Sequence, residues 1–443
     1  MPANLPEADL RDHSIEHGAM RKVGWRLVPF LMLCYFIAYV DRVNAGFAAL
    51  TMNKDLGLSQ AAFGLGAGLF YIAYILFEVP SNLAMEKVGA RLWIARIMIS
   101  WGIVGAATAF VVGPYSFYAS RFLLGAGEAG FFPGVILYLT YWFPKAYRAR
   151  IVAVFMVAIP LSSFFGSPIS AGLLELEGVG GLHGWQWLFI VEGVPAVLLG
   201  VGALFLLPDR PADASWLTSQ QRDWLEGTLA AERAVAKPVG HMPLWKTLSN
   251  KYVWALGLIY CGSSATSNAL SLWQPQILKS FGLSNFETGL MNMIPFGIAA
   301  ALMIMWGRRA DKSGERIWNT ALPLGLTSIC LAATLLTSSS LVATMALLTF
   351  ALIGNYAIKG PFWALSTEFL SASTAAAGIA AINTISHIGT SGATTLLGVI
   401  KDKTGSFPIA LLPLVVLTAA GTITVLLLGR QQQNAAATAA SPA

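Results

Sequence analysis

The chain consists of long apolar segments that alternate with short polar ones. Each apolar run is close to the ~20 residues that an α-helix needs to cross a ~30 Å hydrocarbon core. The first six runs are expected as helices near 25–46, 61–85, 92–113, 115–138, 149–173 and 186–207. After a polar gap, six more are expected near 252–274, 286–306, 317–338, 341–365, 376–400 and 408–429. The pattern predicts an all-α membrane protein with twelve transmembrane helices in two pseudo-symmetric six-helix bundles.

The composition supports this interpretation. Of the 443 residues, 56% are hydrophobic and only 11% are charged, whereas soluble domains carry about 25% charged residues. A water-soluble globular protein is therefore excluded. The three cysteines lie inside apolar runs, too few and too deep for a metal cluster or a disulfide framework, and no metal site is expected. We interpret them as small core residues: Cys34, Cys261 and Cys330.

The basic residues predict how the helices are oriented. The formal net charge is +6, but 21 of the 28 lysines and arginines cluster in alternate loops rather than on one polar face, which argues against nucleic-acid binding. By the positive-inside rule the loops rich in these residues face the cytoplasm, and both termini are expected there. The opposite loops keep only Lys54, Lys279, Lys401 and Lys403.

The polar stretches set the expected domain boundaries. Residues 1–24 lack the features of a secretory signal. The polar gap carries an amphipathic piece from about Thr218 to Arg233, with Thr218 and Gln221 spaced as a capping box. The expected organisation is a cytoplasmic tail at 1–24, an N-terminal bundle at 25–207, a cytoplasmic linker at 208–250, a C-terminal bundle at 251–430 and a disordered tail at 431–443.

A loop motif occurs twice, after the second helix of each predicted bundle. NLAMEKVGAR, which ends at Arg91, and GRRADKSGER, which ends at Arg316, place an acid, a base, a Gly and an Arg at the same offsets. The repeat indicates a parallel duplication. The motif resembles G-x-x-x-D-R-x-G-R-R of the major facilitator superfamily, which implies the fold of that superfamily. It also implies a gating role on the cytoplasmic side for Glu86, Arg91, Asp311 and Arg316; charges that only set topology are the alternative.

A narrower resemblance covers almost the whole chain. Similarity to the anion:cation symporter branch of the superfamily is carried by YFIAYVDRVNAGFA, LFYIAYILFEVPSNLAMEKVGARLWIARIM, RFLLGAGEAGFFPGVILYLTYWFP, GWQWLFIVEGVPAVLLG and GPFWALSTEFL. The resemblance implies proton-driven uptake of a small organic anion across a bacterial inner membrane. The substrate would be a tartrate-like, sugar-acid-like or aromatic-acid-like carboxylate. The proton is then the coupling ion, and no other cofactor is expected.

Charged side chains are expected inside the membrane in the first bundle. Asp41 and Arg42 lie about 24 Å along the first helix, and Arg121 lies about 10 Å in from the outside on the fourth helix, which runs the other way. Glu128 is two turns further on and on the same face. An ionised group at mid-bilayer costs about 2.5–3.5 kcal/mol, so such residues are candidates for function. The pattern predicts a ladder of carboxylates and guanidiniums along one inner wall.

This ladder suits proton-coupled anion transport. A guanidinium binds a carboxylate in a two-pronged geometry and stays charged, whereas a desolvated carboxyl group can take up a proton when its cationic partner leaves. We therefore predict that Asp41 and Glu128 carry protons and that Arg42 or Arg121 neutralises the substrate carboxylate. The symporter branch has matching residues that are understood to act in this way. Structural ion pairs are the alternative.

Further polar residues are candidates for the substrate cavity. Lys359 could offer a second charge to a dicarboxylate or extend to the cytoplasmic surface, and Tyr35 could add a hydroxyl group. Glu78 and Glu192 are instead interpreted as structural partners of loop bases or helix ends. The other candidates for substrate binding are Tyr39, Tyr74, Asn268, Gln274, Asn355, Trp363, Asn383 and His387.

Other functions fit the sequence less well. A proton antiporter that exports amphiphilic compounds should have an acidic, aromatic cavity, so Arg42 and Arg121 argue against it. An enzyme is not expected, because the motifs HExxH, GxSxG and GxxxxGK[ST] are absent. A nutrient sensor of the same fold would carry a longer signalling extension. We expect a monomer that contacts a small organic anion and the lipid bilayer, and the sequence leaves the identity of the carboxylate open.

Overall fold

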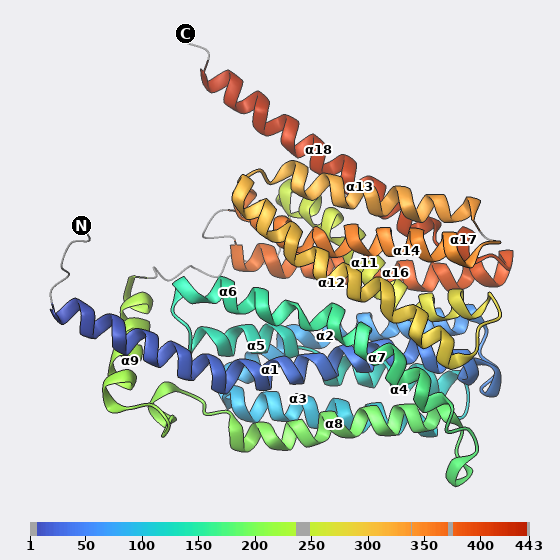
Figure 1. Ribbon diagram of the computed structural model, residues 1–443, viewed down its shortest axis with the longest axis horizontal. Coiled ribbons are helices and arrows are strands. Elements are labelled where there is room, and N and C mark those ends of the chain that lie inside the picture. Colours follow the sequence, from blue (N-terminus) through green and yellow to red (C-terminus); the bar gives the residue numbers. More distant parts are fainter. Residues whose placement is uncertain (1–6, 236–248, 338, 371–374, 441–443) are drawn as a thin grey trace.

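The computed structural model describes residues 7–235, 249–337, 339–370 and 375–440, which are helical along most of their length. The helices form two bundles that lie side by side (Figure 1). The first bundle contains α1 (Glu7–Asp55), α2 (Gln60–Val88), α3 (Ala90–Ala107), α4 (Pro114–Glu128), α5 (Phe131–Thr140), α6 (Lys145–Met156), α7 (Ala158–Leu174) and α8 (Gly184–Leu206). The second contains α11 (Lys251–Lys279), α12 (Asn285–Ser313), α13 (Ile317–Ala333), α14 (Leu341–Ala357), α15 (Lys359–Phe369), α16 (Ala375–Thr404), α17 (Phe407–Ala410) and α18 (Leu412–Ala440). The predicted fold class is confirmed.

The outer surface of both bundles suits a lipid bilayer. Ten helical segments of the described chain are long and apolar enough to cross a membrane. Two more helices, α11 and α16, fall outside these ten but are 29 and 30 residues long, which is enough to span the hydrocarbon core. Large apolar side chains point away from the bundles; Leu198, Ile329 and Val416 are 65%, 69% and 64% exposed. Lipid would cover this surface.

The repeated loop motif places a glycine with positive φ directly after the second membrane helix of each bundle. Gly89 follows α2 with a φ of +99°, and Gly314 follows α12 with a φ of +65°. A positive φ is strained for a residue that has a Cβ atom, so glycine is favoured at both turns. The duplicated motif therefore has its Gly where the chain reverses between two membrane helices.

The fourth membrane crossing is broken where the sequence predicts one continuous helix at 115–138. α4 ends at Glu128 and α5 begins at Phe131, and Gly130 between them has a φ of +86°. A Cβ atom on Gly130 would lie 2.4 Å from the Ser81 hydroxyl oxygen, so α2 packs directly against the break. The prediction of a continuous helix was wrong because the left-handed glycine ends α4. The break leaves Glu128 as the last residue of α4, inside the bundle.

Two other crossings are also divided. The helix predicted at 149–173 is α6 followed by α7, with Val157 between them, and the helix predicted at 341–365 is α14 followed by α15, with Ile358 between them. Both connecting residues keep right-handed backbone angles, with φ of −64° and −67°. The chain therefore stays close to helical through both divisions, unlike at Gly130.

Both ends of the described chain are more helical than the sequence predicts. α1 begins at Glu7, within the predicted tail 1–24, and continues without a break into the membrane segment. α18 continues to Ala440, although a disordered tail was expected from residue 431. Alanine and glutamine are good helix formers, which accounts for the extension. Residues 1–6 and 441–443 lie outside the described residues.

The segment that follows α8 packs on the first bundle. Its helix α9 (Ser219–Val235) lies beside the N-terminal part of α1 (Figure 1). The predicted capping box is present: the Gln221 N–H donates to Thr218 Oγ1 and the Thr218 N–H donates to Gln221 Oε1, both at 3.3 Å. Arg148 of α6 donates to Glu232 of α9 at 2.9 Å. Residues 236–248 of the predicted linker lie outside the described residues.

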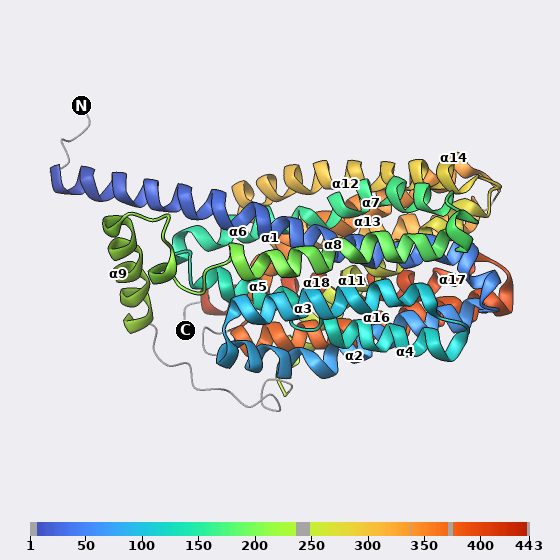
Figure 2. The ribbon, with the colours of Figure 1, turned by 90° about the horizontal axis from the view of Figure 1, so that it is seen from below.

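The two bundles are joined at the end where α1 ends and α2 begins. The charge pattern predicts that this end faces outside, so we call it the outer end and the opposite end the inner end. Figure 2 shows α2 beside α16, where Ser391 Oγ donates to the Gly68 carbonyl at 3.0 Å. Asn292 of α12 donates to the Ser167 hydroxyl of α7 at 2.8 Å. Within the part of the chain that the structure describes, hydrogen bonds between the bundles all lie in the outer half.

Candidate functional site

An ion pair joins two of the residues that the sequence predicts to act in transport. The Arg42 guanidinium of α1 donates to Glu128 Oε1 of α4, through Nε at 2.8 Å and Nη2 at 2.5 Å. The side chains are 15% and 3% exposed. Each charge alone would be costly in the membrane interior, and the pair offsets that cost. The break after α4 holds Glu128 at this level.

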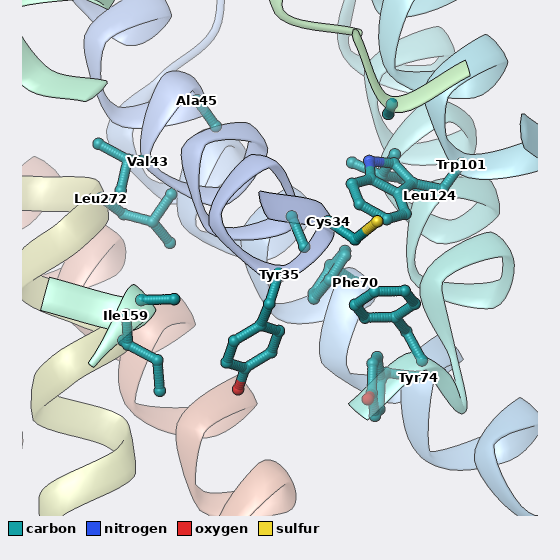
Figure 3. Close-up of a cluster of buried hydrophobic side chains, with 14 of the residues drawn as sticks. Cys34, Tyr35, Val43, Ala45, Phe70, Tyr74, Trp101, Leu124, Ile159 and Leu272 are labelled. Atoms are coloured by element: carbon teal, nitrogen blue, oxygen red, sulfur yellow. The ribbon is translucent and has the colours of Figure 1, made fainter. Parts of the chain in front are cut away.

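Aromatic rings surround the Arg42 guanidinium. Its Cζ atom lies 4.8 Å from the centre of the Tyr39 ring, 5.5 Å from that of Phe70 and 5.7 Å from that of Tyr74. Tyr35 packs edge-on against Tyr39, with 5.0 Å between the ring centres. In Figure 3 the hydroxyl groups of Tyr35 and Tyr74 lie on the same side of the buried cluster. The tyrosines predicted for the site are therefore grouped around Arg42.

Asp41 is next to Arg42 in sequence but lies in a different environment. Its carboxylate accepts a hydrogen bond from Trp101 Nε1 of α3 at 2.6 Å and one from Asn44 Nδ2 at 3.4 Å. The side chain is 4% exposed and makes no ion pair with any lysine or arginine among the described residues. Consecutive residues of a helix point about 100° apart. Asp41 therefore contacts α3, whereas Arg42 contacts α4.

Arg121 is buried, and two of its three guanidinium nitrogens have no hydrogen-bonding partner among the described residues. The residue is 3% exposed, and neither Nε nor Nη1 has a partner among the described residues. Its Cζ atom lies 5.4 Å from the centre of the Phe70 ring, so both Arg42 and Arg121 lie against this ring. Buried donors are nearly always paired, and an unpaired buried charge is costly. An anionic ligand would supply the missing acceptors.

His387 of the second bundle lies beside the tyrosines of the first bundle that surround Arg42. Its imidazole, on α16, lies 5.8 Å from the Tyr71 ring and 5.2 Å from the Tyr74 ring of α2, measured between centres. Its Nδ1 atom is buried and has no hydrogen-bonding partner among the described residues. Tyr74 also contacts the Arg42 guanidinium. The structure therefore brings His387 to the tyrosines around Arg42, as a cavity role requires.

Lys359 and Trp363 lie on α15, close to aromatic rings of the second bundle. The Lys359 ammonium is 5.3 Å from the centre of the Tyr356 ring. The Trp363 ring is 4.9 Å from that of Tyr260 on α11. Both residues are half-buried. Lys359 makes no ion pair in the part of the chain that the structure describes, so its charge stays available.

The remaining polar candidates differ in their surroundings. Asn355 donates to Ser267 at 2.6 Å and so links α14 to α11, while Asn268 donates to the Ser264 carbonyl of its own helix at 2.8 Å. Gln274 is fully buried, and its amide has no hydrogen-bonding partner among the described residues. Asn383 is half-buried on α16. Asn355 therefore holds two helices together, Asn268 bonds within its own helix, and the Gln274 amide is unpartnered among the described residues.

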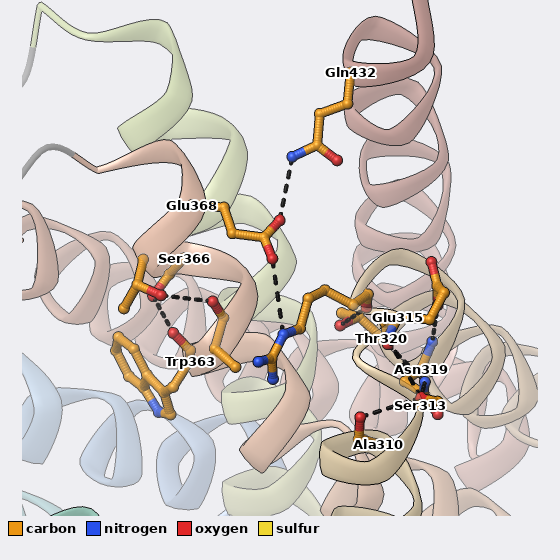
Figure 4. Close-up of polar contacts among 12 residues, drawn as sticks. Ala310, Ser313, Glu315, Asn319, Thr320, Trp363, Ser366, Glu368 and Gln432 are labelled. Atoms are coloured by element: carbon orange, nitrogen blue, oxygen red, sulfur yellow. Dashed lines mark hydrogen bonds and ion pairs between the residues drawn. The ribbon is translucent and has the colours of Figure 1, made fainter. Parts of the chain in front are cut away.

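The four charged residues predicted for gating do not pair with one another. The Arg91 Nε lies 3.4 Å from Asp209, and the Arg316 Nε lies 3.7 Å from Glu368 in the same bundle. Figure 4 shows Glu368 with its polar contacts, one of them to Gln432. Glu86 and Asp311 are exposed. The partners Asp209 and Glu368 are not evident from the sequence, because neither belongs to the repeated motif. At the inner end these charges hold each bundle together separately.

Glu192 differs from its predicted role. The sequence suggested a partner for a loop base or a helix end, but the residue is 4% exposed inside the first bundle. Its Oε1 accepts a hydrogen bond from the Ser170 hydroxyl of α7 at 2.7 Å. It makes no ion pair with a described base. The prediction was wrong because the packing of α8 against α3, α1 and α7, which brings this side chain to Ser170, is not evident from the motif around it.

Known proteins resemble the chain over most of its length. The family model described as Major Facilitator Superfamily matches residues 31–394. A candidate tartrate transporter of Agrobacterium vitis is 51% identical over 394 residues, 89% of this chain and 90% of that protein. A quinolone resistance transporter of Acinetobacter baumannii is 39% identical over 396 residues, 88% of this chain and 90% of that protein. The crystal structure of a D-xylose-proton symporter covers 91% of this chain and 96% of its own, with a TM-score of 0.71 and 14% identity.

Proposed function

The chain belongs to the major facilitator superfamily and is a multi-pass membrane transporter rather than an enzyme, and from this premise we propose that it couples proton entry to uptake of a small organic carboxylate. The substrate would bind between the two bundles and cross by alternating access, in which the bundles rock around the site. The orientation proposed here places both termini in the cytoplasm of a bacterial cell, in its inner membrane.

The two unpartnered guanidinium nitrogens of Arg121, Nε and Nη1, carry this proposal. Arg121 is a buried cation with free donors on an inner wall of the first bundle. A carboxylate accepts two parallel hydrogen bonds from a guanidinium, which matches both its charge and its shape. An amphiphilic cation would be repelled there. The site chemistry therefore favours an anionic substrate.

The ion pair between Arg42 and Glu128 supports the proposed proton coupling. A proton that binds Glu128 removes its charge, and Arg42 is then free to bind a substrate carboxylate. When the substrate leaves, Arg42 again favours the ionised carboxylate, and the proton is released. The same guanidinium thus alternates between two partners. Asp41 is the second proposed proton carrier, held beside Trp101 rather than beside a base.

A hydroxylated dicarboxylate fits the remaining groups best. The ammonium of Lys359 has no described ion-pair partner and could meet a second carboxylate. Tyr39, Tyr74 and His387 could exchange hydrogen bonds with substrate hydroxyl groups. A relative that is 51% identical carries the name of a tartrate transporter, which agrees with this choice. We propose tartrate or a similar sugar acid as the substrate.

Export of amphiphilic compounds is the second candidate function. A relative that is 39% identical is named for quinolone resistance, and aromatic rings line the environment of Arg42. Quinolones also carry a carboxylate, so Arg121 alone does not exclude them. The direction of transport and the response to small acids separate the two functions.

Uptake by purified protein in proteoliposomes tests the substrate class. We would measure labelled tartrate uptake in competition with sugar acids, aromatic acids and a quinolone, for wild type, Arg121→Lys and the matched control Arg96→Lys, whose guanidinium stacks on Trp93 outside the site. We expect small hydroxy acids to compete with tartrate. We also expect the KM to rise about tenfold or more in Arg121→Lys alone, because an ammonium cannot make the two parallel hydrogen bonds of a guanidinium. Competition by the quinolone only, with outward transport, would favour the exporter.

A further inference from the structure

One buried aromatic ring lies against both arginines of the candidate site. Phe70 of α2 is 2% exposed. The Cζ atom of Arg42 lies 5.5 Å from the centre of its ring, and that of Arg121 lies 5.4 Å from it. Among the described residues, Phe70 alone lies within cation–π distance of Arg121. Because the negative face of a ring attracts a cation at this distance, Phe70 stabilises the buried charge of Arg121.

Close packing of α2 against α4 fixes the position of this ring. A Cβ atom on Gly125, one turn after Arg121, would collide with the Phe70 carbonyl oxygen, so the two backbones approach each other closely here. The Phe70 ring also packs edge-on against Tyr71, with 5.1 Å between the ring centres. Figure 3 shows it beside the ring of Tyr74, at 6.2 Å between centres. The ring therefore keeps its place as long as α2 and α4 stay packed.

The two guanidiniums differ in their partners. Arg42 donates through Nε to Glu128 Oε1 at 2.8 Å, whereas Nε and Nη1 of Arg121 have no hydrogen-bonding partner among the described residues. Glu128 is also seven residues after Arg121 on one face of α4, about 10 Å along the helix axis. Two long side chains can span that separation when they extend toward each other. The structure therefore holds Arg121 away from an acid with which it could pair.

An aromatic face stabilises a cation without neutralising it. A carboxylate partner cancels the charge of a guanidinium and occupies its donors, but a neutral ring does neither. We propose that Phe70 is a positioning residue that holds the Arg121 guanidinium apart from Glu128. Arg121 then stays open to the substrate carboxylate, and Arg42 alone releases and rebinds Glu128. This inference rests on the proposed proton symport of a carboxylate.

Fluorinated phenylalanines in place of Phe70 test the role of the ring face. Fluorine withdraws electron density from the face and weakens its attraction for a cation, with little change in shape. The KM for tartrate uptake into proteoliposomes is measured with phenylalanine and with its mono-, di- and trifluorinated forms at this position. We expect the KM to rise with each added fluorine, by about fivefold in all, because Arg121 then pairs more often with Glu128. A KM that stays constant or falls along the series overturns the proposal.

The substitution Phe70→Leu tests whether Glu128 is the acid from which the ring holds Arg121. The control Phe189→Leu removes a ring of the first bundle that is also 2% exposed and lies over no guanidinium among the described residues. Tartrate exchange at equal pH is measured for both variants, each with and without Glu128→Gln.

We expect the KM for exchange to rise about tenfold in Phe70→Leu and by less than about twofold when Glu128→Gln is also present. The reason is that Arg121 then has no carboxylate at that position with which to pair. Phe189→Leu should leave the KM unchanged in both backgrounds. An equal rise for Phe70→Leu in both backgrounds would show that the ring acts through packing alone, and would overturn the proposal.

The outcomes separate this inference from the proposed function. If wild type takes up no carboxylate or ignores the proton gradient, the proposed function fails, and this inference fails with it. If wild type behaves as proposed and fluorination leaves the KM unchanged, only the role of Phe70 fails. Should Phe70→Leu not fold, the fluorinated series decides, because it keeps the shape of the ring.

Discussion

Arg42 donates two hydrogen bonds to one oxygen of Glu128, so that Oε1 receives both and Oε2 receives neither from this guanidinium. The contact is end-on rather than a fork on both oxygens. The ion pair therefore leaves one oxygen of Glu128 on which a proton could bind before the guanidinium departs. This geometry suits a residue that must exchange a cationic partner for a proton.

We expect Arg42→Lys to transport poorly. A lysine ammonium is a point charge that cannot make both bonds from fixed positions, and it fits less well among the rings of Tyr39 and Tyr74. Uptake of tartrate under an inward proton gradient should fall about tenfold, with little loss in Arg96→Lys. The measurement is the initial rate in proteoliposomes. A rate for Arg42→Lys equal to that of wild type would show that the two guanidinium hydrogen bonds are not needed.

Lys359→Gln tests the second charge of the substrate. If the ammonium meets a second carboxylate, the variant should lose about tenfold in apparent affinity for tartrate and much less for a monocarboxylic sugar acid. Lys403→Gln, at the exposed outer end, is the matched control. No loss of affinity for either acid would instead indicate that Lys359 extends to the membrane surface, as the sequence also allowed, and an equal loss for both would contradict a contact with the second carboxylate.

Much of the fold follows from the sequence because each membrane helix must satisfy its own backbone within one apolar run. The charges at Asp41, Arg42, Arg121 and Glu128 were also identifiable, since an ionised side chain within an apolar run is rare. Which of these charges pair with one another could not be identified from the sequence. The level at which Glu128 meets Arg42 depends on the break at Gly130, and a single left-handed glycine among many glycines gives no distinct signal.

Contacts between helices far apart in sequence could not be predicted either. Glu192 was assigned to a helix end because its neighbour Pro195 suggested one, yet it faces Ser170 inside the bundle. Asn355 fitted a cavity role by its spacing to Lys359, but its amide is used to bind Ser267. Both outcomes depend on how helices rotate against one another, which periodicity alone does not determine.

The outer end should open more readily in Asp402→Asn. The Asp402 carboxylate accepts hydrogen bonds from the Gln60 and Ala61 N–H groups at 3.0 and 2.7 Å, at the start of α2 in the other bundle. Asparagine carries no charge and offers a single acceptor, so we expect roughly fivefold more of the outward-open form. The readout is labelling of a single cysteine at Ser391 by an impermeant reagent, with the native cysteines replaced. If labelling rises equally in Lys403→Gln, the hydrogen bonds of Asp402 do not hold the outer end closed.

Gly130→Ala should destabilise the first bundle. The substitution places a Cβ atom at a φ of +86° and 2.4 Å from the Ser81 hydroxyl oxygen, so either α2 or the break must move. We expect a loss of about 2 kcal/mol or more in stability and loss of uptake, because Glu128 moves with the break. Thermal unfolding in detergent is the measurement. Gly172→Ala, which has no atom within 4 Å of the added Cβ, is the control and should match wild type.

The central claim, proton-coupled uptake through Glu128, is tested most directly by tartrate accumulation in proteoliposomes with and without an inward proton gradient. Wild type, Glu128→Gln and the exposed control Glu175→Gln are compared, and exchange of internal for external tartrate at equal pH is recorded for each. We predict that the gradient drives wild type and Glu175→Gln to accumulate tartrate above equilibrium, whereas Glu128→Gln exchanges tartrate but does not accumulate it. Accumulation by Glu128→Gln at the wild-type level, or wild-type uptake that ignores the gradient, would contradict the account.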